Sequence, residues 1–181
     1  MTDQEREARN ERKLKQLHLF MRPKIAAIID DLEGHGYRPR IQDAWRSPAD
    51  QKKAWLSGHS KLLWGFHNAT APDGTPEALA CDILDDDRPF SPDQRYVMML
   101  ASSALVHDLV TGIGWGLGAR LREGLDAAIL RRDWSANVKL GWDPCHVQIT
   151  GISVAQARKG ARPGALVLAA SPPTRRLTVA R

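Results

Sequence analysis

The chain has 181 residues, 43% of them apolar, and it contains six tryptophans. This length suits one domain with a substantial core, and this composition excludes a largely disordered chain. No apolar run reaches the roughly 18 residues that a membrane-spanning helix needs. The charged residues 1–7 have no apolar stretch behind them, so no secretory signal is predicted and the protein is expected to be cytoplasmic on synthesis.

The net charge of +5 originates at the carboxyl-terminal end. No acidic residue follows Asp143, and without the six basic residues beyond it, 20 basic residues stand against 21 acidic ones. Those six are Arg158, Lys159, Arg162, Arg175, Arg176 and Arg181. Residues 156–181 are therefore predicted to be a basic, irregular tail, either simply solvated or holding an anionic polymer such as nucleic acid or cell wall. No nucleic-acid-binding motif accompanies this charge, so specific nucleic-acid binding is not expected.

The first half of the chain reads as two helices, a strand and a third helix. Helical spacing of apolar residues predicts helices over 4–20 and 23–33, the second ended by glycines 34 and 36. A strand follows at 37–45. Ser47 is the predicted N-cap of a short helix, with Pro48 in its first turn.

The second half begins with residues 58–76, which lack periodicity and are predicted to form a long ordered loop, a kind of segment that is usually functional. The later predictions are a strand at 78–84, a helix from Ser91 to about Val110, a short helix at 120–131, and strands at 138–142 and 147–150 that flank a turn at Asp143-Pro144. Strands among helices without regular alternation indicate an α+β fold.

The expected sheet is small and largely antiparallel, with the strands of Asp82 and His146 as neighbours. Helices cover one face of this sheet and the other face carries a site. The whole forms one domain over residues 1–155, of which about 1–20 are a helical extension. The oligomeric state is left open.

Three residues are candidate metal ligands. His67 lies in the unpatterned loop, while Asp82 and His146 lie in apolar strands. An unpaired carboxylate at position 82 would be costly to desolvate, and a metal or an arginine would relieve that cost. Two imidazoles and one carboxylate leave the fourth tetrahedral position of zinc open to water, as in catalytic sites, although non-haem iron also uses such a set.

Two further residues have side chains suited to catalysis. Asp143 precedes His146 by three residues, so its carboxylate could act as general base, or it could merely cap the Asp-Pro turn. Arg46 stands between a strand and a helix, where it could pair with a substrate carboxylate or an oxyanion, or form a surface ion pair.

The two cysteines, Cys81 and Cys145, each stand beside a candidate ligand. Neighbours on a strand point to opposite faces, so buried and unpaired thiols are expected. A bridge between adjacent strands and metal binding by the thiols themselves are the alternatives.

Together these segments resemble the D-Ala-D-Ala carboxypeptidase and L-alanyl-D-glutamate endopeptidase family, zinc peptidases of peptidoglycan that include many phage endolysins. The matching segments are Trp45-Arg-Ser47 with Gln51, His67 with Ala80-Cys-Asp82, Gly112-Ile-Gly-Trp-Gly116, and Asp143-Pro-Cys-His146. The resemblance covers roughly residues 20–150.

The resemblance implies Zn²⁺ bound by His67, Asp82 and His146. It implies Asp143 as catalytic base and Arg46 as a residue that contacts the substrate or the intermediate, and Gln51 and Trp115 are expected in the substrate site. The implied fold is the small α+β zinc-peptidase fold of the D-Ala-D-Ala peptidases, which hedgehog-type domains share. The implied substrates are stem peptides of peptidoglycan, met after release to the cell wall. An aspartate as base favours the endopeptidase over the carboxypeptidase branch.

The chain also departs from the family pattern. His67 and Asp82 are 15 residues apart, where the pattern has seven, so an insertion of about residues 70–77 is predicted to loop out between them. His59 is an alternative to His67 as ligand. If the insertion blocks the cleft, the chain is instead a non-catalytic, zinc-containing wall-binding module.

Overall fold

The computed structural model describes residues 1–164. Four strands, six α-helices and one 3-10 helix make up this part of the chain. In chain order the elements are α1 (Asp3–Leu14), α2 (Arg22–Gly34), β1 (Pro39–Asp43), α3 (Pro48–Leu56), η1 (Phe66–Asn68), β2 (Ala80–Asp85), α4 (Gln94–Val106), β3 (Leu109–Gly112), α5 (Ala119–Leu130), β4 (Asp143–Ile149) and α6 (Val154–Arg158).

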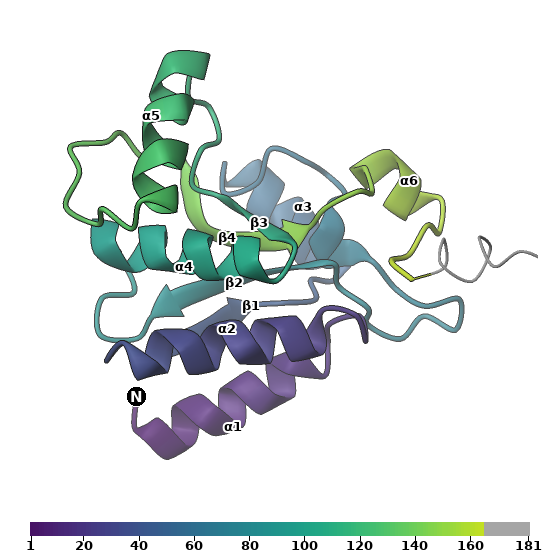
Figure 1. Cartoon of the computed structure of the whole chain (residues 1–181). Helices are drawn as coiled ribbons and strands as arrows, with labels where there is room; N and C mark the ends of the chain where they lie inside the picture. The colour runs from purple at the N-terminus through teal and green to yellow at the C-terminus, as the bar shows by residue number, and fades with distance from the viewer. Residues whose placement is uncertain (165–181) are drawn as a thin grey trace, which may run out of the picture.

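The strands form one antiparallel sheet in the order β1-β2-β4-β3 (Figure 1). Asp82 on β2 lies directly opposite His146 on β4. The α+β class and the pairing of these two strands are therefore confirmed. Cross-strand neighbours on one face of a sheet bring their side chains within contact range, so this register by itself joins two of the predicted ligands.

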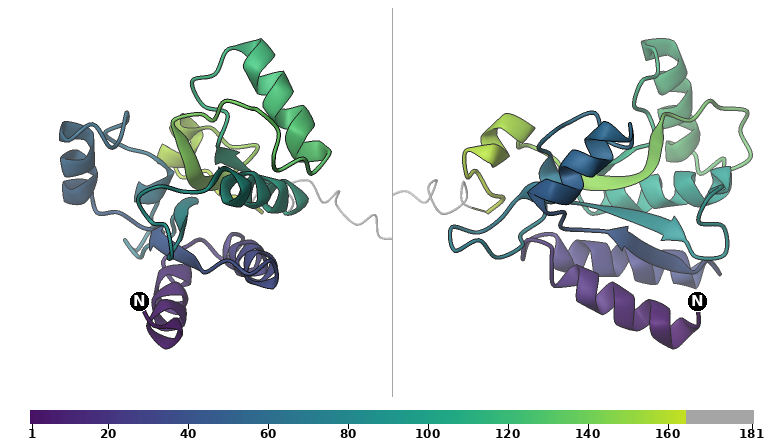
Figure 2. Two further views of the ribbon diagram at one scale, coloured as in Figure 1. Left: turned by 90° about the vertical axis from the view of Figure 1, so that its left-hand side faces the viewer. Right: turned by 180° about the vertical axis from the view of Figure 1, so that it is seen from behind.

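Helices α2 and α4 cover one face of the sheet, and α3 lies on the other side (Figure 2). The core face of α2 presents Ile25, Ile28, Ile29 and Leu32, a helical spacing of apolar residues that are 7% exposed or less. The prediction that Ser47 caps a short helix is confirmed, because its side chain accepts a hydrogen bond from the Asp50 amide. The face of the sheet that α2 and α4 do not cover carries the candidate site.

Helix α1 lies along the free edge of β1. The buried Asn10 side chain donates to the Pro39 carbonyl and accepts from the Ile41 amide, so it replaces the strand partner that the edge lacks. The helix ends at Leu14 and does not reach residue 20 as predicted. The backbone of Gln16 accepts a hydrogen bond from the Ala78 amide instead, and this pairing draws the chain out of the helix.

Two predictions about the last strands are wrong. Helix α4 ends at Val106 rather than near Val110, because residues 109–112 pair with β4 as strand β3. The predicted pair of strands around an Asp143-Pro144 turn is a single strand, β4. A register shift places Thr111 opposite Val147 and Gly112 opposite Asp143, so Pro144 falls in a bulge where its missing N–H breaks no ladder bond.

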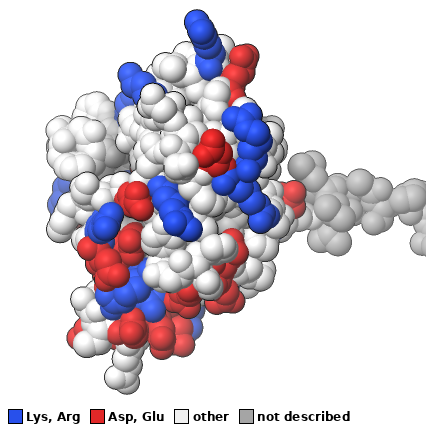
Figure 3. Space-filling model, turned by 60° about the vertical axis from the view of Figure 1, so that its left-hand side comes forward, with Lys and Arg blue, Asp and Glu red and all other residues white. Residues whose placement is uncertain are grey.

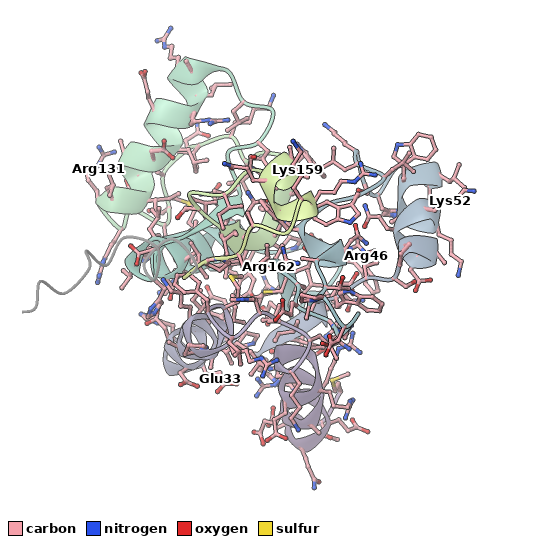
Figure 4. The ribbon with its side chains drawn as sticks, turned by 90° about the vertical axis from the view of Figure 1, so that its right-hand side faces the viewer. Glu33, Arg46, Lys52, Arg131, Lys159 and Arg162 are labelled. Atoms are coloured by element: carbon pink, nitrogen blue, oxygen red, sulfur yellow. The ribbon has the colours of Figure 1, made fainter. Side chains whose placement is uncertain are left out.

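The prediction of an irregular tail from residue 156 is wrong for residues 156–158, which belong to a helix. Residues 154–158 form α6, and Arg162 donates hydrogen bonds to the Thr70 and Ala157 carbonyls and pairs with Glu77 (Figure 4). The tail's remaining residues, 165–181, lie outside the described part. On the face shown in Figure 3, basic and acidic side chains are interspersed. Among the helices of residues 1–164, none has the length and apolarity needed to cross a bilayer.

Candidate metal centre and active site

Three side chains from three elements converge on one point. Asp82 comes from β2, His146 from β4 and His67 from the 3-10 helix η1 in the loop before β2. The Oδ1 atom of Asp82 lies 3.0 Å from Nδ1 of His146 and 3.5 Å from Nε2 of His67, and the two nitrogens are 3.3 Å apart. The structure therefore brings together the three predicted ligands, which could hold a metal ion.

The size of this triangle suits zinc. Bonds of about 2.0–2.1 Å at tetrahedral angles place neighbouring ligand atoms about 3.3 Å apart. The three separations, 3.0, 3.3 and 3.5 Å, bracket that value. The donor set is also chemically suitable, since zinc accepts both imidazole nitrogen and carboxylate oxygen.

Hydrogen bonds behind the ligands fix their orientation. Nδ1 of His67 lies 2.6 Å from the Ala44 carbonyl oxygen, so the proton resides on Nδ1 and the Nε2 lone pair faces the triangle. On the other ring, Nε2 of His146 lies 3.1 Å from Oε1 of Gln148, which leaves Nδ1 to face the same point. Both histidines are at most 7% exposed. These contacts prepare the rings for binding a cation.

The charges of the triangle are mutually dependent. Burial opposes ionisation of Asp82, but His67 and His146 outweigh it and hold the pKa of this carboxyl well below its usual range. Burial likewise disfavours the charged form of His67, and the Asp82 carboxylate more than offsets this, so the pKa of His67 is raised. The site thus concentrates negative charge on Asp82 and is electrostatically suited to a cation.

Asp143 lies at the first position of β4 and lines the same cleft. Burial and the neighbouring Asp82 raise the pKa of its carboxyl. The backbone around it is closely packed, since a Cβ at Gly112 would meet the Asp143 carbonyl oxygen at 2.2 Å and one at Gly141 would meet the Trp115 amide nitrogen at 2.5 Å. Glycines at both positions allow this approach, which holds Asp143 and Trp115 at one wall of the cleft.

Arg46 points into the cleft from the segment between β1 and α3 (Figure 4). Its Nε donates to Asp43 at 2.8 Å and its Nη1 donates to Gln51 at 2.9 Å. Its Nη2 lies 2.7 Å from Asp43 and 3.5 Å from Oδ2 of Asp82. The guanidinium therefore contacts the oxygen of Asp82 that does not face the two imidazoles, and it helps to orient this carboxylate.

Gln51, which the resemblance places in the substrate site, lines the cleft and also supports Arg46. Its side chain is 2% exposed. The amide accepts from Arg46 and donates to Oγ of Ser60 and to the Leu62 carbonyl. Gln51 thus connects the arginine beside the ligands to the loop that follows α3.

Aromatic side chains form part of the cleft lining. The ring of Trp115 lies 5.0 Å from that of His146 and 5.5 Å from that of Trp142. Trp115, predicted from the glycine-rich segment, therefore does line the site. Trp142 was missed although it directly precedes the Asp143 motif. Lys61, also in the lining, was missed because its loop carries no periodic signal.

The insertion between His67 and Asp82 does loop out. Thr70 bridges to Pro76, and the Ala71 amide donates to the Thr75 carbonyl, so this segment is a small hairpin. No residue of 70–77 lines the cleft of about 450 Å³, so the insertion does not block it. His59 borders the cleft but lies outside the triangle and contacts Ser57.

Both cysteines are free and buried, as expected, and neither belongs to the group of side chains that could hold a metal ion. Burial raises the pKa of the Cys145 thiol to about 12 and that of Cys81 well above its usual range. The thiols therefore stay protonated and act as small apolar groups in the core beneath the ligands.

The chain was compared with known families, curated proteins and solved structures. No family model matches the chain, and no curated protein matches it. Among solved structures, the chain is similar to the crystal structure of the L-Ala D-Glu endopeptidase ChiX of Serratia marcescens, with 17% sequence identity and a TM-score of 0.44. The likeness covers 79% of this chain and 87% of that one.

Proposed function

We propose that this chain is a zinc-dependent peptidase that hydrolyses the stem peptides of peptidoglycan at the L-alanyl-D-glutamate bond. The observation that carries the metallopeptidase proposal is the triangle of His67, Asp82 and His146, whose ligand atoms are spaced as a tetrahedral zinc site requires. The substrate class rests on the resemblance of the segments around Arg46, Asp82 and His146 to the peptidoglycan peptidases. In this proposal the protein acts on the cell wall after release.

When bound, zinc supplies Lewis acidity, which polarises a carbonyl and makes water a stronger acid. The chain supplies the proton transfers. The Asp143 carboxylate takes a proton from the attacking water and later gives it to the leaving amine. Its raised pKa suits the first role, because a carboxylate whose pKa is higher is a stronger base toward the attacking water.

Arg46 contributes by position and charge. Because Asp43 and Gln51 hold its guanidinium, Arg46 keeps the Asp82 carboxylate turned toward the imidazoles. The same positive charge, fixed beside the cleft, stabilises negative charge that develops on the scissile carbonyl oxygen. Trp115 and Trp142 offer an aromatic surface against which the peptide backbone lies.

Digestion of purified peptidoglycan, with and without a chelator, tests this proposal. Mass spectrometry should find new amino-terminal D-glutamate, absent from the chelated reaction. Release of free D-alanine instead would identify a D-Ala-D-Ala carboxypeptidase, the second candidate. Release of neither fragment from walls of several chemical types, by protein with bound metal, would refute the peptidase proposal and favour the wall-binding module.

A further inference from the structure

Lys61 is a cation of the cleft that none of the described carboxylates neutralises. Among residues 1–164, one arginine and one lysine, Arg46 and Lys61, line the cleft with the three carboxylates of Asp43, Asp82 and Asp143. Arg46 pairs with the first two of them. Within residues 1–164, Lys61 has no carboxylate oxygen within 4.0 Å of its Nζ, so its charge remains available to a ligand.

An aromatic contact holds the Lys61 side chain at the cleft. Its Nζ lies 4.5 Å from the centroid of the Trp142 ring, a cation–π arrangement. Trp142 in turn packs on Trp115, and Trp115 packs on the ligand His146. The ammonium group is therefore placed at one end of an aromatic row whose other end is the candidate metal centre.

Gln51 anchors the loop that carries Lys61 to the residues of the site. Gln51 donates to Oγ of Ser60 and to the Leu62 carbonyl, on the two sides of Lys61. The same Gln51 accepts from Arg46, which contacts Asp82. A backbone fixed at both neighbours limits the positions that the Lys61 ammonium can reach.

From these contacts we infer that Lys61 is a specificity residue that binds a substrate carboxylate; the inference rests on the proposed function and deepens it. In a γ-linked stem peptide, the D-glutamyl residue directly after the scissile bond keeps a free α-carboxylate. Asp143, ionised, repels that carboxylate, and Lys61 provides the opposite charge along the same wall. The chain is therefore selective for acidic stem peptides over those in which this carboxylate is amidated.

A lysine substitution with a matched control tests the inference. Lys61→Met keeps the aliphatic stem against Trp142 and removes the charge. Lys52→Met removes an equal charge from the outer side of α3, away from the cleft lining (Figure 4). Two stem peptides serve as probes, identical except that the D-glutamyl carboxylate is free or amidated. Dissociation constants come from calorimetry on the Asp143→Asn background with zinc, and KM and kcat come from chains with Asp143 intact.

With Lys61 intact, the acidic peptide should bind about fivefold more tightly than the amidated one. Lys61→Met should abolish that preference by raising KM and Kd for the acidic peptide alone, with kcat unchanged, and Lys52→Met should preserve it. Equal binding of both peptides with Lys61 intact, no binding of either, or a preference that survives Lys61→Met would overturn the inference. Cleavage without a charge preference would leave the proposed function standing, whereas a Lys61-dependent preference without cleavage would refute the function alone.

Discussion

At the scale of single residues, the proposed function divides the site into three side chains that would hold a cation and one that would transfer protons. His67, Asp82 and His146 face one point and are fixed from behind by protein contacts. Asp143 is apart from the triangle and has a carboxyl whose pKa is raised by burial and by Asp82. This division predicts that metal binding and turnover can be separated by substitution.

Asp143→Asn should abolish most turnover while preserving the metal. The amide has the shape of the carboxylate but cannot accept a proton, and loss of a general base costs about 10²- to 10⁴-fold in kcat. Metal content, measured by elemental analysis, should remain at one ion per chain. Turnover within a few-fold of the unchanged protein would exclude Asp143 as the base, and loss of metal would make it a ligand.

The shifted pKa values of His67 and Asp82 predict a pH range in which this pair stabilises the metal-free protein. The pKa of His67 is raised above 6.5, so its stabilisation is fully present below pH 6.5 and is lost as pH rises through the folded-state pKa. The pKa of Asp82 is lowered below 3.8, so its stabilisation is present above pH 3.8 and is lost as pH falls further. This pair therefore contributes most between these limits.

Thermal unfolding of chelated protein between pH 5 and 9 checks this window. The melting temperature should fall above pH 6.5, and His67→Gln should weaken that fall. Added zinc should stabilise more strongly as pH rises over the same range, because the imidazoles must be deprotonated to bind it. A chelated protein whose stability is the same at pH 6 and pH 8 would contradict the assigned charge pair.

At the scale of elements, the site depends on two backbone segments that approach so closely that only glycine fits at the contact. The glycine-rich segment after β3 lies against the start of β4, with the Trp142 amide donating to the Trp115 carbonyl at 3.2 Å. A Cβ at Gly141 would lie 2.5 Å and 2.6 Å from two backbone atoms of Trp115. This contact sets both the tryptophan wall and the direction in which β4 begins.

Gly141→Ala should therefore destabilise the protein and reduce its activity together. Forcing the segments apart should cost about 1–3 kcal/mol, as overpacking usually does, and should displace Trp115 and Asp143. Gly124→Ala is the matched control, because a Cβ there meets no atom within 4 Å and alanine should favour helix α5 by up to about 1 kcal/mol. Chemical denaturation and peptide cleavage measure the two effects. Equal stability of the two variants would refute the close approach.

The sequence predicted those elements whose residues carry a local signal. The capped helix α3 and the apolar face of α2 follow from spacing and capping, which are local properties. The pairing of the strands of Asp82 and His146 is not local, and it was expected because both strands carry candidate ligands of one site. The predicted helix extends into the first residues of strand β3, because the apolar residues there continue the pattern of that helix. The bulge at Pro144 was read as a turn, since only pairing with a distant strand distinguishes the two.

For the site, residue types and motifs predicted the ligands but not their surroundings. Nothing in the local sequence shows that Gln51 is buried between Arg46 and the loop at 60–62, or that Lys61 reaches Trp142. These contacts join segments that are distant along the chain. They depend on how the loop after α3 folds back over the sheet, and that packing is a tertiary property.

At the scale of the whole molecule, the segments outside the resemblance divide into two kinds. Helix α1 is part of the domain, since Asn10 and Arg9 bond the backbone of β1. Residues 159–164 are also part of it through Arg162. Residues 165–181, with Arg175, Arg176 and Arg181, lie outside the described part and carry half of the basic residues that follow Asp143.

Removal of residues 165–181 should weaken attachment to the anionic wall without changing cleavage of a small soluble peptide. The lost charges act through long-range attraction, which salt screens over about 10 Å at 0.1 M. Sedimentation with isolated walls should show the difference at low salt and little of it at high salt. Equal attachment of both forms at low salt would eliminate this role for the basic residues.

The central claim is that one metal ion in the His67–Asp82–His146 triangle makes this chain a hydrolase. The most direct test is to strip the metal and titrate zinc back while following cleavage of an L-alanyl-D-glutamyl peptide. The account predicts no turnover without metal and a linear rise that ends at one equivalent per chain, with Asp82→Asn showing no such rise. Undiminished turnover in the stripped protein, or an Asp82→Asn variant that responds like the unchanged chain, would contradict it.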